Sequence, residues 1–211
     1  RNLVLNRFFL RELGFADLED LKGVLDRVPE GMAEDGQSWF YRALSARIKA
    51  RALQEQLCQY DRRILTLERD LAKARGVFRF KYFQWLALLF TEMFLDRLTD
   101  DPAVLRMQLN RFLKDEQKRG AVTAVIPEFE PDDLRRAAFF MATGSGKTLL
   151  LHAHLQQVLY YLSTGRNPAA LVDRPDQRRE FANILLITPN EGLSAQHLDE
   201  LQLSGLDGAL L

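Results

Sequence analysis

The stretch Met141-Ala142-Thr143-Gly144-Ser145-Gly146-Lys147-Thr148 places two glycines directly before a lysine and a threonine. The short apolar run at residues 137–140 precedes it and is interpreted as a buried strand. The leucine-rich run at residues 149–155 follows it and predicts the first turns of a helix. A glycine-rich loop between a strand and a helix is the setting in which such a stretch binds phosphate. The alternative is a Gly-Ser-Gly turn that precedes a helix by chance.

Each residue type in this loop suits the binding of a nucleotide. Gly144 and Gly146 lack a side chain, so the backbone can approach an anion closely. The N–H groups of the loop and of the first helical turn then point at the phosphates. We expect Lys147 to reach the β- and γ-phosphates and the Thr148 hydroxyl to bind Mg²⁺. The predicted nucleotide contacts are Thr143, Gly144, Ser145, Gly146, Lys147 and Thr148, with Lys147 and Thr148 as the catalytic pair.

The composition is that of a globular protein. The chain has 211 residues, of which 47% are apolar and 27% charged, enough for one large core or two small ones. Its net charge is zero, so nucleic acid would have to bind a local basic patch. The single cysteine, Cys58, fits a reducing compartment and predicts a cytoplasmic protein. The apolar run at residues 85–90 is far shorter than the roughly twenty residues that a membrane span needs. Because the chain lacks an initiator methionine, we expect it to come from within a longer protein.

Residues 1–119 read as a helical region. Between about residues 43 and 75, small and apolar residues alternate at spacings of three and four, which is the pattern of a coiled-coil seam. An intramolecular helical hairpin is favoured over a dimer because the seam is short. Further helices are predicted from Phe80 to Leu98 and from Asp101-Pro102 to just before Gly120. The seam consists of Ala43, Ala46, Ala50, Leu53, Leu57, Tyr60, Ile64, Leu67 and Leu71.

Residues 120–211 read as a second, α/β region. Short apolar runs at residues 121–126, 137–140 and 183–189 predict strands, and the first of them is rich in β-branched residues. Helices are predicted from Lys147 to about Ser163 and from Ser194 to Leu203. Strands that alternate with helices form a parallel sheet with right-handed crossovers. The predicted fold class is therefore α/β, with a helical N-terminal region ahead of a parallel-sheet domain.

A second polar stretch, Thr188-Pro189-Asn190-Glu191-Gly192-Leu193-Ser194-Ala195-Gln196, follows the last predicted strand. Taken alone, it is also consistent with a simple strand-to-helix turn. Together the two stretches resemble motifs I and Ia of superfamily 2 helicases and translocases of the DEAD/DEAH-like group. Met141, where DEAD-box proteins usually have alanine, makes the chain similar to the restriction-subunit branch of type I and type III enzymes, including the Res subunit and its relatives in phage defence. The resemblance covers about residues 137–200.

The resemblance implies the first part of a RecA-like P-loop domain that binds Mg²⁺ and ATP. It implies an ATP-dependent helicase or translocase that acts on DNA, expected to be double-stranded, with a methyltransferase or nuclease as a partner subunit. Pro189, Asn190 and Gln196 would lie near the nucleic acid. The aromatic-rich run at residues 82–87 resembles a segment used near adenine, which assigns that role to Gln84.

The sequence limits the expected activity of this chain and leaves two alternative functions open. The chain has no acidic Mg²⁺-binding motif downstream of the glycine-rich loop, so we expect residues 1–211 alone to bind ATP but to hydrolyse it negligibly. A different P-loop NTPase, such as a GTPase or a small-molecule kinase, is one alternative, although the sequence lacks a guanine-reading Asn-Lys-x-Asp segment. A non-catalytic helical interaction module is the other.

Overall fold

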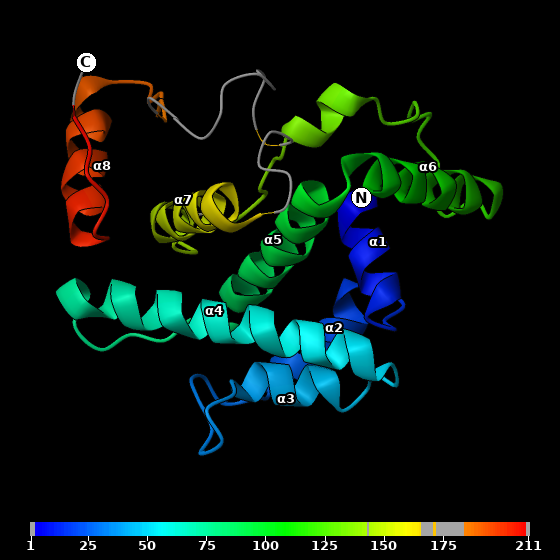
Figure 1. Cartoon of the computed structure of the whole chain (residues 1–211), viewed down its shortest axis with the longest axis horizontal. Helices are drawn as coiled ribbons and strands as arrows, with labels where there is room; N and C mark the ends of the chain where they lie inside the picture. The colour runs from blue at the N-terminus through cyan, green and yellow to red at the C-terminus, as the bar shows by residue number, and fades with distance from the viewer. Residues whose placement is uncertain (1–2, 143, 166–170, 172–183, 210–211) are drawn as a thin grey trace.

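The computed structural model describes residues 3–142, 144–165, 171 and 184–209, and it is 64% helix (Figure 1). The helices follow one another along the chain. In chain order they are α1 (Val4–Glu12), α2 (Leu18–Leu25), α3 (Trp39–Ser45), α4 (Arg51–Arg75), α5 (Tyr82–Asp100), α6 (Pro102–Lys118), the 3₁₀ helix η1 (Pro131–Arg135), α7 (Lys147–Thr164) and α8 (Glu191–Leu203).

The predicted parallel sheet is absent from the described residues, so the α/β, RecA-like prediction is wrong. Residues 121–126, 137–140 and 184–188 form no strand, and residue 183 lies outside the described part. Several of their large side chains are exposed: Phe139 by 51%, Phe140 by 63% and Ile187 by 82%. A strand of a parallel sheet is stable only when neighbouring strands satisfy its backbone and cover both of its faces. These segments do not pair with one another, so their apolar character was not sufficient to predict strands.

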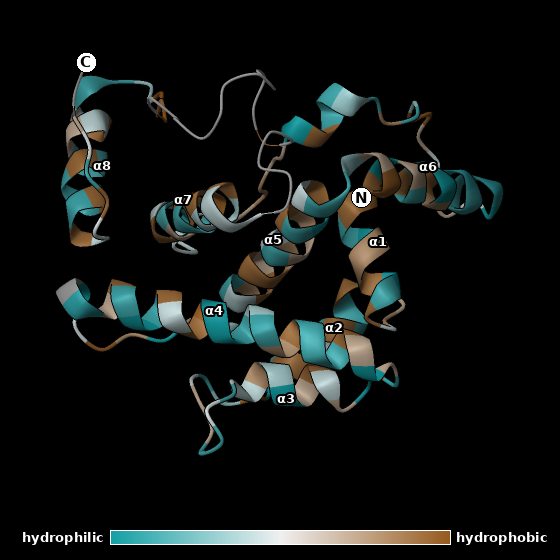
Figure 2. Cartoon of the chain, in the orientation of Figure 1, coloured by the Kyte–Doolittle hydropathy of each residue, from teal (hydrophilic) through white to brown (hydrophobic). Residues whose placement is uncertain are grey.

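Helix α5 is the centre of the molecule. Helices α1, α4, α6 and α7 all pack against it, which explains why its sequence is apolar on almost every side (Figures 1 and 2). Trp85, Leu88, Leu89 and Met93 on this helix are at most 2% exposed. Neither α5 nor any other helix in the described part of the chain is both long and apolar enough to cross a membrane. The packing of α7 on α5 brings the residues before α7 close to the start of α5.

The predicted coiled-coil hairpin, residues 43–75, is divided between α3 and α4. The two helices are separated at residues 46–50, so Ala46 and Ala50 belong to the connection. Leu57, Ile64 and Leu71 are fully buried where α4 packs on its neighbours, and α5 crosses α4 in Figure 1. The apolar face of α4 is therefore covered within the chain.

Helix α8 is attached mainly by polar contacts at its C-terminal end. The Arg75 guanidinium, at the end of α4, donates to the carbonyl oxygens of Glu200 and Leu203 and to the Ser204 hydroxyl. It also forms a 2.8 Å ion pair with the Glu200 carboxylate. A cation at this position satisfies the last carbonyl groups of the helix and opposes the negative end of its dipole. Residues 188–190 precede the opposite end of α8, about 20 Å away by helix geometry.

Candidate phosphate-binding site

The backbone of the loop before α7 has the shape that its glycines allow. Gly144 and Gly146 have φ angles of 76° and 81°, in the left-handed region that other residues rarely adopt. Gly146 is the N-cap of α7 and therefore provides no capping side chain. Within the described residues, the N–H groups of Lys147, Thr148 and Leu149 have no hydrogen-bond acceptor. The start of α7 thus presents backbone donors at the positive end of a helix dipole.

Lys147 and Ser145 both fold back onto the loop. The Lys147 ammonium donates to the Ala142 carbonyl oxygen at 2.9 Å, and the Ser145 hydroxyl donates to the same oxygen at 2.6 Å. The Lys147 side chain is exposed, so its ammonium lies at the surface of the loop. A phosphate oxygen is a stronger acceptor for an ammonium group than a neutral carbonyl. The Lys147 ammonium can therefore leave the Ala142 carbonyl oxygen for a phosphate oxygen without a change in α7.

Gln84 links the first turn of α5 to this loop. Its Oε1 accepts from the Lys81 N–H at 3.0 Å, and its Nε2 donates to the Ser145 carbonyl oxygen at 3.0 Å. A Cβ atom added to Gly146 would lie 2.7 Å from the same Nε2. The carboxamide, on a residue only 8% exposed, thus fixes the loop through its backbone. The adenine contact predicted for Gln84 stays a prediction.

A histidine on α7 supports the segment that enters the loop. The His154 ring stacks on the Phe139 ring with centroids 4.2 Å apart. The His154 Nδ1 lies 3.0 Å from the Gln157 Oε1, and the Gln157 Nε2 donates to the Leu88 carbonyl oxygen and to Glu92. Because the amide group faces His154 with its oxygen, Nδ1 carries the proton of a neutral ring. Burial lowers the pKa of His154 to about 4, against the opposing effect of the Gln157 hydrogen bond.

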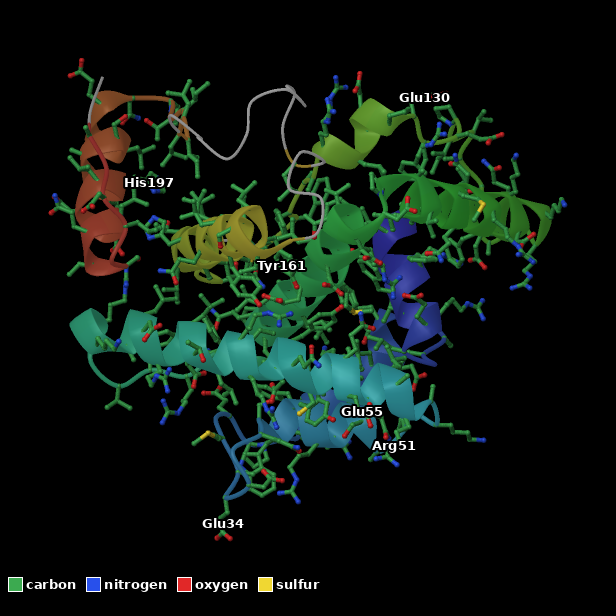
Figure 3. The ribbon with its side chains drawn as sticks, viewed as in Figure 1. Glu34, Arg51, Glu55, Glu130, Tyr161 and His197 are labelled. Atoms are coloured by element: carbon green, nitrogen blue, oxygen red, sulfur yellow. The ribbon has the colours of Figure 1, made fainter. Side chains whose placement is uncertain are left out.

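A buried carboxylate joins α4, α5 and α7 behind the site. Glu92 on α5 forms a 2.7 Å ion pair with Arg63 on α4 and accepts from the Tyr161 hydroxyl on α7 at 2.9 Å. Arg63 also donates to the Tyr161 hydroxyl oxygen at 2.9 Å. Figure 3 shows Tyr161 on α7 near the centre of the molecule. The contact is fully hydrogen-bonded, so it fixes how α7 lies on α4 and α5. Sequence reasoning missed it because Glu92 and Arg63 lie 29 residues apart on separate helices.

Of the residues predicted to contact nucleic acid, Pro189 and Asn190 directly precede α8 and Gln196 lies in its second turn. Pro189, Asn190 and Gln196 are all exposed. Asn190 is the N-cap of α8, and its side chain accepts from the Leu193 N–H at 2.9 Å. This contact accounts for Asn190 structurally, whereas nothing in the structure explains Pro189 or Gln196. Thr143 lies outside the described residues.

The Mg²⁺-binding role predicted for Thr148 stays a prediction. Thr148 is partly exposed in the first turn of α7. Across the described ranges, no three histidine, cysteine or acidic side chains gather into a metal site. Mg²⁺ usually keeps several waters and takes other ligands from nucleotide phosphates.

Comparison of the chain with protein-family models, curated proteins and solved structures gave no match.

Proposed function

We propose that this chain binds ATP with Mg²⁺ through the loop at residues 142–148 and the first turn of α7. The observation that carries the proposal is the convergence of two left-handed glycines, one lysine and three helix amides that have no acceptor among the described residues, all at a single helix N-terminus. Such a group of donors and positive charge favours an anion with several oxygens, such as a triphosphate.

Each group has a defined task in this proposal. The amides of the first turn of α7 donate to the phosphate oxygens. Lys147 leaves the Ala142 carbonyl oxygen and pairs with the β- and γ-phosphates. The Thr148 hydroxyl is one ligand of the Mg²⁺, which neutralises phosphate charge. Gln84 holds the Ser145 carbonyl oxygen and so keeps the loop in its anion-binding shape.

The finer proposal is that this site is the ATP-binding part of a DNA-dependent ATPase of the helicase or translocase class. Its support is the resemblance of residues 141–148 and 188–196 to two helicase motifs. If the ATP site and the DNA site are energetically coupled, each ligand must change the affinity of the protein for the other by the same factor. Duplex DNA should therefore tighten or weaken Mg-ATP binding. An ATP affinity that is independent of saturating DNA contradicts this finer proposal and leaves the nucleotide site in place.

Isothermal titration calorimetry with Mg-ATP tests the nucleotide site itself. We expect Lys147→Ala to raise the Kd about tenfold or more, because a charge-assisted hydrogen bond contributes about 1.5–3 kcal/mol. Lys49→Ala is the control, because Lys49 is another exposed lysine, in the connection between α3 and α4. Equal affinities for wild type and Lys147→Ala, or tighter binding of GTP than of ATP, would contradict the proposal.

A further inference from the structure

A groove runs along one side of α6, away from the phosphate loop. Its second wall is formed around Glu128, in the segment that leads from α6 to η1. The hollow has a volume of about 480 Å³. Arg106, Met107, Asn110, Arg111, Lys114, Asp115, Lys118 and Glu128 line it.

Hydrogen bonds hold the second wall in place. The Asn110 side chain donates to the Phe129 carbonyl oxygen at 3.0 Å and accepts from the Phe129 N–H at 2.6 Å. The Gln117 side chain donates to the Ile126 carbonyl oxygen at 3.1 Å. The groove is therefore formed before any ligand binds.

The lining has an excess of positive charge although the whole chain is neutral. Four cations face two carboxylates, Asp115 and Glu128. Arg111 and Lys118 are exposed and have no ion pair within the described part of the chain.

The other two cations have weak partners. Lys114 lies 2.8 Å from Glu128, and Arg106 lies 3.7 Å from Glu130. These carboxylates are 53% and 75% exposed, and Glu130 stands at the edge of the molecule in Figure 3. Solvent-exposed ion pairs of this kind contribute about 0–1 kcal/mol, so a phosphate can replace the carboxylate.

We propose that this groove binds the phosphodiester backbone of a nucleic acid strand. From Arg106 to Lys118 the cations cover about 18 Å of helix, which corresponds to about five phosphates at the rise of one strand. A concave lining with an excess of positive charge fits a chain of phosphates better than a flat lipid surface does. The contacts are to phosphate, so the binding is independent of base sequence. It does not depend on the nucleotide site proposed above.

The test is the salt dependence of binding to a labelled oligonucleotide of about 20 nucleotides, measured by fluorescence anisotropy without ATP. Four phosphate contacts on a single strand predict that affinity falls about fifty-fold between about 50 and 200 mM salt. The double variant Arg111→Gln, Lys118→Gln should reduce this to about sevenfold and weaken binding about tenfold or more at the lower salt. Glu128→Gln should act in the opposite direction and tighten binding, which a folding defect would not do.

The matched control is Lys22→Gln, Lys49→Gln, which removes the same charge from exposed lysines on α2 and beside α3. It should leave affinity and salt slope unchanged. Equal losses in the α6 double variant and the control would overturn the proposal. It would also be overturned by tighter binding to phosphatidylserine vesicles or to polyglutamate than to the oligonucleotide.

Discussion

Gly146→Ala perturbs the loop before α7 in two ways that can be separated. An alanine at a φ of 81° carries the left-handed strain of about 1–2 kcal/mol. Its Cβ would also lie 2.7 Å from the Gln84 Nε2, so the carboxamide must move and release the Ser145 carbonyl oxygen. The loss of that hydrogen bond adds about 0.5–1.5 kcal/mol. We expect Gly146→Ala to lower the free energy of unfolding by about 2–3 kcal/mol.

Gly144→Ala is the matched control. Gly144 has a φ of 76°, and a Cβ placed there would meet no atom within 4 Å. This variant should carry the backbone strain alone and cost about 1–2 kcal/mol. In a Gln84→Ala background the collision disappears, so Gly146→Ala should cost no more there than Gly144→Ala. The coupling energy between Gly146→Ala and Gln84→Ala is therefore expected to be about 1 kcal/mol.

Urea denaturation followed by far-UV circular dichroism measures these free energies. The variants are compared by their midpoint urea concentrations at a common m-value, because the extrapolation of the free energy to zero urea is the main source of error. Equal costs for Gly144→Ala and Gly146→Ala in the wild-type background would refute the contact between Gln84 and the loop. Strict additivity of Gly146→Ala and Gln84→Ala would refute it independently.

Two further predictions concern buried groups. Folding lowers the pKa of His154 from 6.5 to about 4, so the unfolded chain binds a proton at this histidine more readily than the folded chain does. The free energy of unfolding should therefore fall by about 3 kcal/mol as the pH decreases from about 6.5 to 4. His154→Asn keeps a donor for Gln157 and should lose this part of the pH dependence in urea titrations; an identical pH profile for both proteins contradicts the buried neutral ring. Asp61→Ala should lower the free energy of unfolding by about 3 kcal/mol or more, because the Ser38 N–H and hydroxyl and the Trp85 Nε1–H lose their buried acceptor. A loss below about 1 kcal/mol would show that these donors find water instead.

Local signals predicted where α6 and α7 begin. Asp101 followed by Pro102 specified the start of α6, where the Asp101 carboxylate accepts from the Ala103 and Val104 N–H groups at 3.0 Å. The start of α7 at Lys147 followed from the glycines before it. Such signals lie within a few residues of the structure they determine, so they can be read without knowledge of the rest of the fold.

The features that the sequence did not predict depend on contacts between residues far apart in the chain. Residues 137–140 and 184–188 have the composition of buried strands, but a strand depends on partners elsewhere in the chain. The contact of Gln84 with Ser145 spans 61 residues, and the aromatic residues around Gln84 were its only sequence signal. The basic groove on α6 went unnoticed because charges spaced along a helix are normally read as a solvated face.

Amide chemical shifts of the ¹⁵N-labelled protein during titration with Mg-ATP test the central claim most directly. The amides of Gly144, Gly146, Lys147 and Thr148 should shift together and saturably, and in Lys147→Ala the same shifts should require about tenfold more Mg-ATP or more. Saturable shifts that leave these four amides unaffected, or no shifts at millimolar Mg-ATP, would contradict the assignment of this loop as a phosphate site.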